Sequence, residues 1–143
     1  MKAEHDWNFT STYTHPLRTN NIHLASGQSV ITDAPVDNHG LGQAFSPTDL
    51  LSTSLASCVL TIMGIHVNSK DYDLISANAS IQKTMAANPR RVAAIRIDIQ
   101  VVLSGGASDH DLAVLEKVGR ACPVARSLHP ELMQELHFSF ERA

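Results

Sequence analysis

Two cysteines, Cys58 and Cys122, are the residues of this 143-residue chain best suited to nucleophilic chemistry. The reactive form of cysteine is the thiolate, which is favoured by a helix amino terminus, a nearby cation or a hydrogen-bond donor. Cys122 directly precedes Pro123, and proline is common at the first position of a helix. We therefore expect Cys122 at a helix amino terminus, where backbone N–H groups favour a thiolate. Arg120 and Arg126 lie close to it in the sequence.

Cys58 lies within the stretch "SPTDLLSTSLASCVLTIMGIH", residues 46–66. Ser46 followed by Pro47 predicts an N-cap and a first helical residue, which places Cys58 about three turns into the helix. The helix has a wide apolar face and small uncharged residues elsewhere, so we expect it to be buried nearly all round. Small neighbours would let a substrate approach Cys58. However, free cysteine is often buried, so a core-filling role stays open.

Other kinds of site find little support in the sequence. Eight histidines are many for this length, but no cysteine or histidine pair has zinc-finger spacing, and neither HExxH nor GxSxG occurs. We interpret most histidines as polar surface residues. No metal and no cofactor is expected.

The composition indicates one globular domain over residues 1–143, with 43% apolar and 17% charged residues. A net charge of −3 with scattered Lys and Arg argues against nucleic-acid binding. The apolar run 59–65 is interrupted by Thr61 and Gly64, so no membrane span is expected. The amino end lacks the pattern of a secretory leader, and two cysteines suit a reducing compartment. We therefore expect a soluble cytoplasmic protein.

Periodicity and turn residues predict the order β-β-β-α-β-β-α-α-β, an α+β fold whose helices are segregated from an antiparallel sheet. Ser26-Gly27-Gln28 predicts a turn within a hairpin or three-stranded meander, and Asn88-Pro89 predicts a second turn. Ser108, with Asp111 three residues later, predicts a capped helix. The expected strands lie in residues 7–14, 21–35, 74–85, 94–103 and 135–141, and the later helices in 108–121 and from 122 onward.

Together, "FSPTDLLSTSLASCVLTIMGI" and "ACPVARSL" resemble the two cysteine signatures of the OsmC/Ohr family. The first matches at Cys58 and the second at Cys122, and the element order fits over essentially the whole chain. The resemblance implies an OsmC-like intertwined homodimer, with antiparallel sheets, two central helices and two active sites at the subunit interface.

The same resemblance implies a thiol-dependent peroxidase that acts on organic hydroperoxides and, less efficiently, on hydrogen peroxide in oxidative-stress defence. Cys58 would attack the peroxide and become a sulfenic acid, which Cys122 would trap as a disulfide. An external dithiol reductant, such as a lipoylated protein, would reopen that disulfide.

One position departs from the family pattern. Peroxidase members carry Glu directly after the helix-opening Pro, paired with an Arg from the amino-terminal hairpin. Here Thr48 follows Pro47, and Asp49 is displaced by about 100° around the helix. Arg18 is the candidate arginine.

Two alternatives to the peroxidase stay open. In the first, the chain is a binding module for a small hydrophobic ligand held by Phe45, Leu55 and Met63, with weak or no peroxidase activity. In the second, the cysteines form a buried, redox-inert pair in a stress-induced dimer.

Overall fold

The computed structural model describes residues 6–143, which form two compact units divided between Leu50 and Leu51. A single domain over residues 1–143 stays a prediction. Residues 1–5, on which part of the leader expectation rests, lie outside the described residues.

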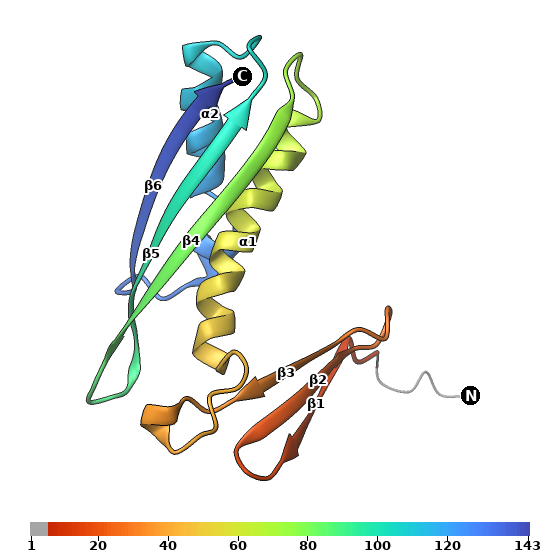
Figure 1. Ribbon diagram of the computed structural model, residues 1–143, viewed down its shortest axis with the longest axis vertical. Helices are drawn as coiled ribbons and strands as arrows, with labels where there is room; N and C mark the ends of the chain where they lie inside the picture. Colours follow the sequence, from red (N-terminus) through yellow and green to blue (C-terminus); the bar gives the residue numbers. More distant parts are fainter. Residues whose placement is uncertain (1–5) are drawn as a thin grey trace. The chain divides into compact units, whose positions relative to one another are not determined.

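The amino-terminal unit contains a three-stranded antiparallel meander, β1-β2-β3 (Figure 1), as expected. Its strands are β1 (Phe9–Thr14), β2 (Arg18–His23) and β3 (Ser29–Asp33), followed by a 3-10 turn at Val36–Asn38. Gly27, in the predicted turn, has a positive φ of 75°, which glycine adopts at no steric cost. Within residues 6–50 no apolar side chain is buried, and Phe9 and Tyr13 are exposed. This sheet therefore has no apolar core of its own.

Helix α1 (Pro47–Val67) begins where the sequence predicts, with Ser46 Oγ accepting a hydrogen bond from the Asp49 N–H at 3.0 Å. Its burial is narrower than expected, because the sheet of the carboxy-terminal unit covers one stripe of the helix. Leu51 is 38% exposed and Ile65 60% exposed. The buried residues are Ser52, Leu55, Ala56, Val59, Met63 and Val67.

By length and composition alone, α1 is long and apolar enough to cross a membrane, with a mean hydropathy of 1.7 in its most apolar stretch. The interruption of the apolar run 59–65 therefore does not exclude a membrane span. A core helix of a soluble protein meets the same criterion, so the finding is weak evidence for a membrane.

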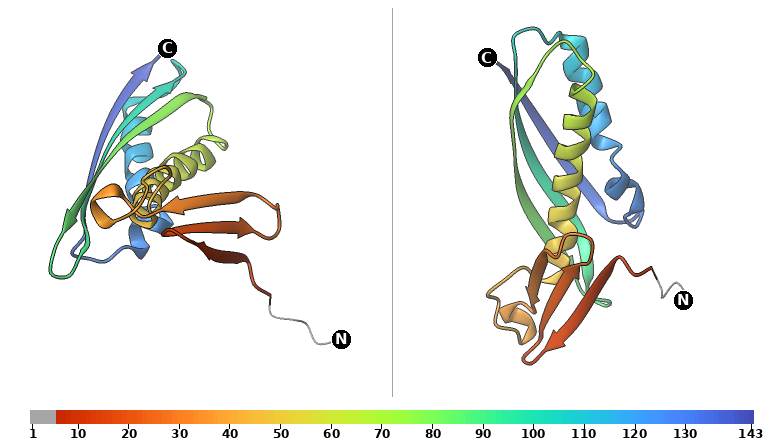
Figure 2. Two further views of the ribbon diagram at one scale, coloured as in Figure 1. Left: turned by 60° about the horizontal axis from the view of Figure 1, so that its bottom comes forward. Right: turned by 90° about the vertical axis from the view of Figure 1, so that its right-hand side faces the viewer.

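The carboxy-terminal unit is a three-stranded sheet, β4-β5-β6, with α1 and the later helix α2 on the same face (Figure 2). Its elements are β4 (Leu74–Ala86), β5 (Arg91–Leu103), α2 (Asp109–Arg120), α3 (Pro123–Ser127) and β6 (Met133–Arg142). The element order agrees with the prediction, but the sheet is mixed. β4 and β5 are antiparallel, whereas β6 runs parallel to β5 with Ala94 opposite Met133. α2 and α3 form the crossover that a parallel pair requires.

The apolar core lies between this sheet and its helices. Alternate residues of β5 point inward, from Ile95 to Leu103, while Arg96 and Gln100 are exposed. Leu55 and Val59 of α1 and Leu115 of α2 complete the same cluster, which also contains Cys122. The period-two pattern therefore predicted the buried face of β5.

Candidate functional site

Cys122 is the N-cap of α3, as the Cys-Pro pair predicts, and its side chain is fully buried. Its Sγ accepts a hydrogen bond from the Ala125 N–H at 3.4 Å. α3 is only five residues long, so packing around it must hold this geometry.

Cys58 lies in the middle of α1, is half-buried and packs against the core that contains Cys122. Both cysteines are free thiols. The Cys58 side chain lies near that of Cys122, close enough to raise the pKa of the Cys122 thiol. The fold thus brings together two thiols that are far apart in the sequence.

Burial raises the pKa of the Cys122 thiol above its ordinary value of 9.0. The hydrogen bond from Ala125 lowers this pKa, but the interactions with Cys58 raise it further. Cys122 is therefore protonated at neutral pH, although its position at a helix amino terminus predicted a thiolate. Burial outweighs the hydrogen bonds from the Ala125 and Val124 backbone N–H groups at the start of this short helix.

The two nearby arginines do not point at the Cys122 sulfur. Arg126 donates from Nε to the Ala121 carbonyl at 3.1 Å. Arg120 donates from Nη2 to Glu116 and to the Leu136 carbonyl, both at 2.9 Å. Because Cys58 is half-buried and Cys122 fully buried, Cys58 is better placed to meet a substrate.

Arg18, the candidate thiolate partner, is held within the amino-terminal unit by a buried carboxylate. Its Nε and Nη2 donate to the two oxygens of Asp33 at 2.7 and 2.8 Å, and Nη2 also donates to Gln43 at 2.9 Å. The hydrogen bonds from Arg18 hold the pKa of Asp33 below its ordinary value. Asp33 was missed in the sequence, because only the pairing of β2 with β3 sets it opposite Arg18.

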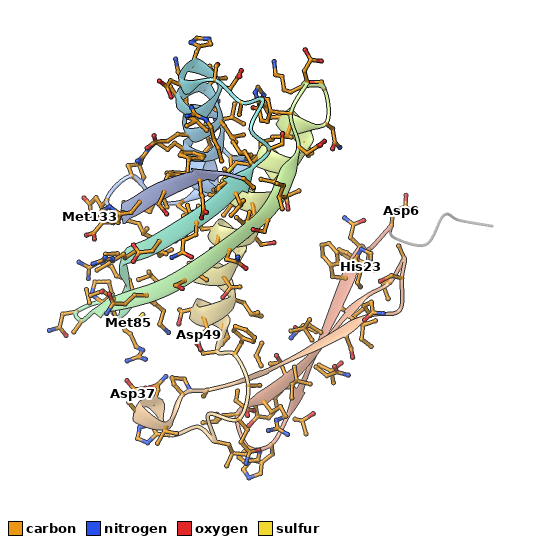
Figure 3. All side chains as sticks on the ribbon, turned by 45° about the horizontal axis from the view of Figure 1, so that its top comes forward. Asp6, His23, Asp37, Asp49, Met85 and Met133 are labelled. Carbon is orange, nitrogen blue, oxygen red and sulfur yellow. The ribbon has the colours of Figure 1, made fainter. Side chains whose placement is uncertain are left out.

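Thr48 and Asp49 lie in the first turn of α1, where Figure 3 labels Asp49. Thr48 Oγ1 lies 3.2 Å from Ser46 Oγ. Asp49 Oδ2 accepts a hydrogen bond from the Ser46 backbone N–H at 2.9 Å. The carboxylate of Asp49 therefore takes part in capping α1.

The three residues predicted to line an apolar pocket differ in exposure. Leu55 and Met63 are fully buried in the core of the carboxy-terminal unit, and Phe45 is 51% exposed. In this structure Leu55 and Met63 therefore contribute packing rather than an accessible pocket wall.

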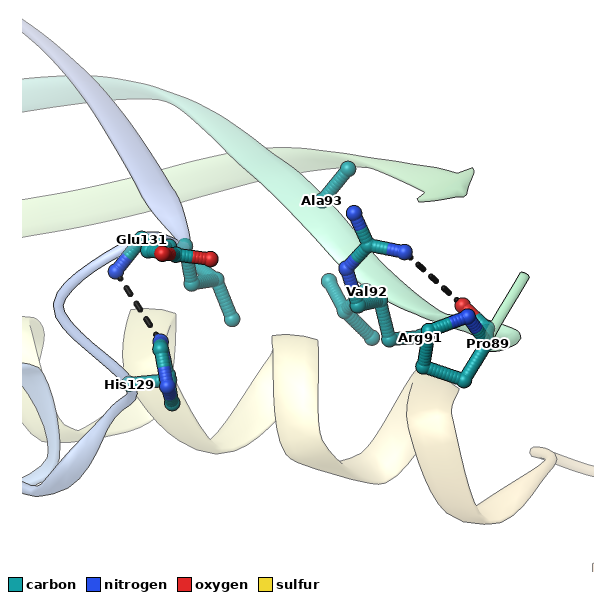
Figure 4. A pocket seen from close by; sticks show the side chains of 7 residues that line it. Pro89, Arg91, Val92, Ala93, His129 and Glu131 are labelled. Atoms are coloured by element: carbon teal, nitrogen blue, oxygen red, sulfur yellow. Dashed lines mark hydrogen bonds between the residues drawn. The ribbon is translucent and has the colours of Figure 1, made fainter. Parts of the chain in front are cut away.

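A cavity of about 460 Å³ lies where β5 and β6 begin (Figure 4). His129 Nδ1 accepts a hydrogen bond from the Glu131 N–H, and Arg91 donates to the Pro89 carbonyl. No cysteine lines this cavity; its walls are Pro89, Arg91, Val92, Ala93, His129, Glu131 and Leu132. Within residues 6–143, no group of three or more His, Cys, Asp or Glu side chains could hold a metal ion.

Comparison with known proteins gives a family match and several similar structures. The model of the family described as OsmC-like protein matches residues 40–136. A solved structure from Psychrobacter arcticus 273-4, described as a "putative osmotic stress induced and detoxification response protein", is 42% identical with a TM-score of 0.87. That match covers 97% of this chain and 100% of the other. No curated protein matches the chain.

Two more distant structures carry names that refer to organic hydroperoxide resistance. The Legionella pneumophila protein is 13% identical with a TM-score of 0.65, and the match covers 95% of this chain and 99% of the other. The Elizabethkingia anophelis protein is 12% identical with a TM-score of 0.69, and the match covers 98% of this chain and 99% of the other. At these identities the similarity shows the fold alone.

Proposed function

Because the chain belongs to the OsmC-like protein family, we propose that it is a thiol-dependent peroxidase that reduces organic hydroperoxides and, less efficiently, hydrogen peroxide. The observation that carries this proposal is that Cys58 packs against the same core that contains Cys122 and raises the pKa of its thiol. A half-buried thiol can meet a substrate, and a buried neighbouring thiol can react with the product formed on it.

In the first step, the Cys58 thiolate attacks one oxygen of ROOH. The O–O bond breaks, ROH leaves after taking up a proton, and Cys58 becomes a sulfenic acid. In the second step, the sulfur of Cys122 attacks that of Cys58. The S–O bond breaks, the hydroxyl leaves as water with the Cys122 proton, and a disulfide forms. A dithiol, such as that of a lipoylated protein, then reduces the disulfide and is itself oxidised.

In the second step the Cys122 proton passes to the departing hydroxyl as the sulfur attacks, because the attacking form of a cysteine is the thiolate. The raised pKa of the Cys122 thiol means that it does not compete with Cys58 for the hydroperoxide. For Cys58, we propose that Arg18, oriented by Asp33 and Gln43, steadies the thiolate.

We further propose that the working form is a cytoplasmic homodimer. The amino-terminal sheet buries no apolar side chain among residues 6–50, and Leu51 and Ile65 of α1 are exposed. A three-stranded sheet needs an apolar surface to pack against for independent stability. A second copy of the chain would supply this surface, as the family resemblance implies.

The proposal is tested with reduced protein, cumene hydroperoxide and dihydrolipoamide, following loss of the hydroperoxide. Wild type should turn over, and Cys58→Ser should not. Equal hydroperoxide loss with both proteins would refute the proposal. If one equivalent of hydroperoxide leaves the mass unchanged, a binding module is favoured, and resistance of both native thiols to alkylation favours an inert pair.

A further inference from the structure

Gln134 is a polar residue on the inward face of β6. The inward positions that follow it are apolar, with Leu136 buried and Phe138 and Phe140 packed against the core. An amide in such surroundings costs free energy unless it is hydrogen-bonded. The hydrogen-bond partner of the Gln134 amide therefore indicates why a glutamine occupies this position.

That partner is Ala125 in α3. Gln134 Nε2 donates to the Ala125 carbonyl at 2.9 Å, and the Ala125 N–H donates to Cys122 Sγ at 3.4 Å. Ala125, which donates to the Cys122 sulfur, thus also accepts a hydrogen bond from β6.

A second connection to β6 lies on the other side of Cys122. Arg120 donates to the Leu136 carbonyl at 2.9 Å, and its guanidinium lies 5.1 Å from the centre of the Phe138 ring. The segment that carries Cys122 is therefore attached to β6 both before and after the cysteine. Since a single helical turn is not stable by itself, these contacts must fix its position.

We propose that Gln134 is a positioning residue for Cys122, holding α3 so that the Cys122 sulfur can reach that of Cys58. This inference rests on the proposed function, because closure of the Cys58–Cys122 disulfide is the second step of the proposed peroxidase reaction. When closure is slow, the Cys58 sulfenic acid meets a second hydroperoxide. That hydroperoxide loses an oxygen to the sulfur and leaves as ROH, and the sulfenic acid becomes a sulfinic acid.

The test compares wild type, Gln134→Met and the matched control Gln100→Met, which changes an exposed glutamine on β5. The oxidant is diamide, an azo compound. One thiolate adds to its N=N bond, the second thiol displaces the hydrazine, and a disulfide remains. We expect closure in Gln134→Met to be about five-fold slower, as for the loss of one hydrogen bond. Closure in Gln100→Met should match wild type.

A parallel reaction with cumene hydroperoxide gives a readout that general destabilisation would not move. Gln134→Met should lose its first free thiol at the wild-type rate but accumulate more sulfinic acid, seen by intact mass. Gln134→Glu, which places an acceptor opposite the Ala125 carbonyl, should close more slowly still.

The inference fails if Gln134→Met closes with diamide at the wild-type rate, if Gln100→Met is slowed equally, or if wild type forms no intramolecular disulfide. The proposed function fails separately, if wild type closes with diamide but not with hydroperoxide.

Discussion

Asp49 and Ser46 exchange two hydrogen bonds at the start of α1. Asp49 Oδ2 accepts from the Ser46 N–H at 2.9 Å, and Ser46 Oγ accepts from the Asp49 N–H at 3.0 Å. This reciprocal pair is a capping box with Asp in place of the usual Glu. The same arrangement starts α2, where Ser108 pairs with Asp111. Asp49 therefore has a structural role like that of Asp111.

The first prediction follows from that equivalence. Asp49→Ala should lower the free energy of unfolding by about 0.3–1.5 kcal/mol, because one helix-end N–H loses its partner. Hydroperoxide reduction at saturating dithiol should be unchanged. Urea unfolding and the cumene hydroperoxide assay measure the two effects, and Asp111→Ala is the matched control. A loss of activity as large as that of Cys58→Ser, confined to the Asp49 variant, would show instead that Asp49 acts at the thiol.

Local patterns predicted much of the fold. Ser46-Pro47 and Ser108 with Asp111 mark helix starts by hydrogen bonds within one turn, and the alternation in β5 marks its buried face. These features depend on neighbours a few residues away. The direction of β6 does not, because it is fixed by where α2 and α3 return the chain.

The chemistry of the site depended on distant contacts and was predicted less well. Cys122 was expected to favour a thiolate from its helix position, yet burial by the core raises its pKa. Asp33 pairs with Arg18 only through strand register, and Gln134 supports Cys122 through a separate strand. Asp33 and Gln134 are ordinary polar residues, and their partners cannot be identified from their spacing in the sequence.

The second prediction tests whether Met63 packs the core or lines an open pocket. Met63→Ala should lower the free energy of unfolding by about 2–5 kcal/mol, because a fully buried side chain leaves a cavity. Met133, 58% exposed at the start of β6 (Figure 3), is the matched control, and Met133→Ala should cost far less. Urea unfolding at one fixed protein concentration measures both. Similar small losses would indicate that Met63 borders open space.

The third prediction concerns acid stability. The pKa of Asp33 is lowered in the folded protein, chiefly by its hydrogen bonds with Arg18. Its stabilising contribution is therefore present above the ordinary value of 3.8 and is lost as the pH falls through the lowered pKa. Asp33→Asn removes this contribution, so the difference in unfolding free energy between wild type and variant should shrink as the pH falls below about 4.

Urea unfolding at several pH values gives this difference. The matched control is Asp98→Asn, which changes an exposed carboxylate paired with Arg96 and should have a small effect at every pH. A difference that stays constant down to the lowest pH would show that the Arg18–Asp33 ion pair does not stabilise the fold.

The fourth prediction concerns the ionisation of Cys122. Burial is the largest cause of its raised pKa, and Cys58 adds to it through a hydrogen bond and its charge. Cys58→Ala removes the second contribution, so the pKa of Cys122 should fall toward its ordinary value. For comparison, the Cys122 pKa with Cys58 present is taken from the pH dependence of its alkylation, located by mass spectrometry. The ultraviolet absorbance of the thiolate against pH measures the variant directly, since Cys122 is then the only cysteine.

Arg126→Gln in the Cys58→Ala background is the control, because Arg126 donates to the Ala121 carbonyl rather than to the sulfur. It should leave the titration of Cys122 unchanged. If this control raises the pKa, while Cys58→Ala alone has no effect, then a nearby cation sets the ionisation of Cys122 and contact between the two thiols does not.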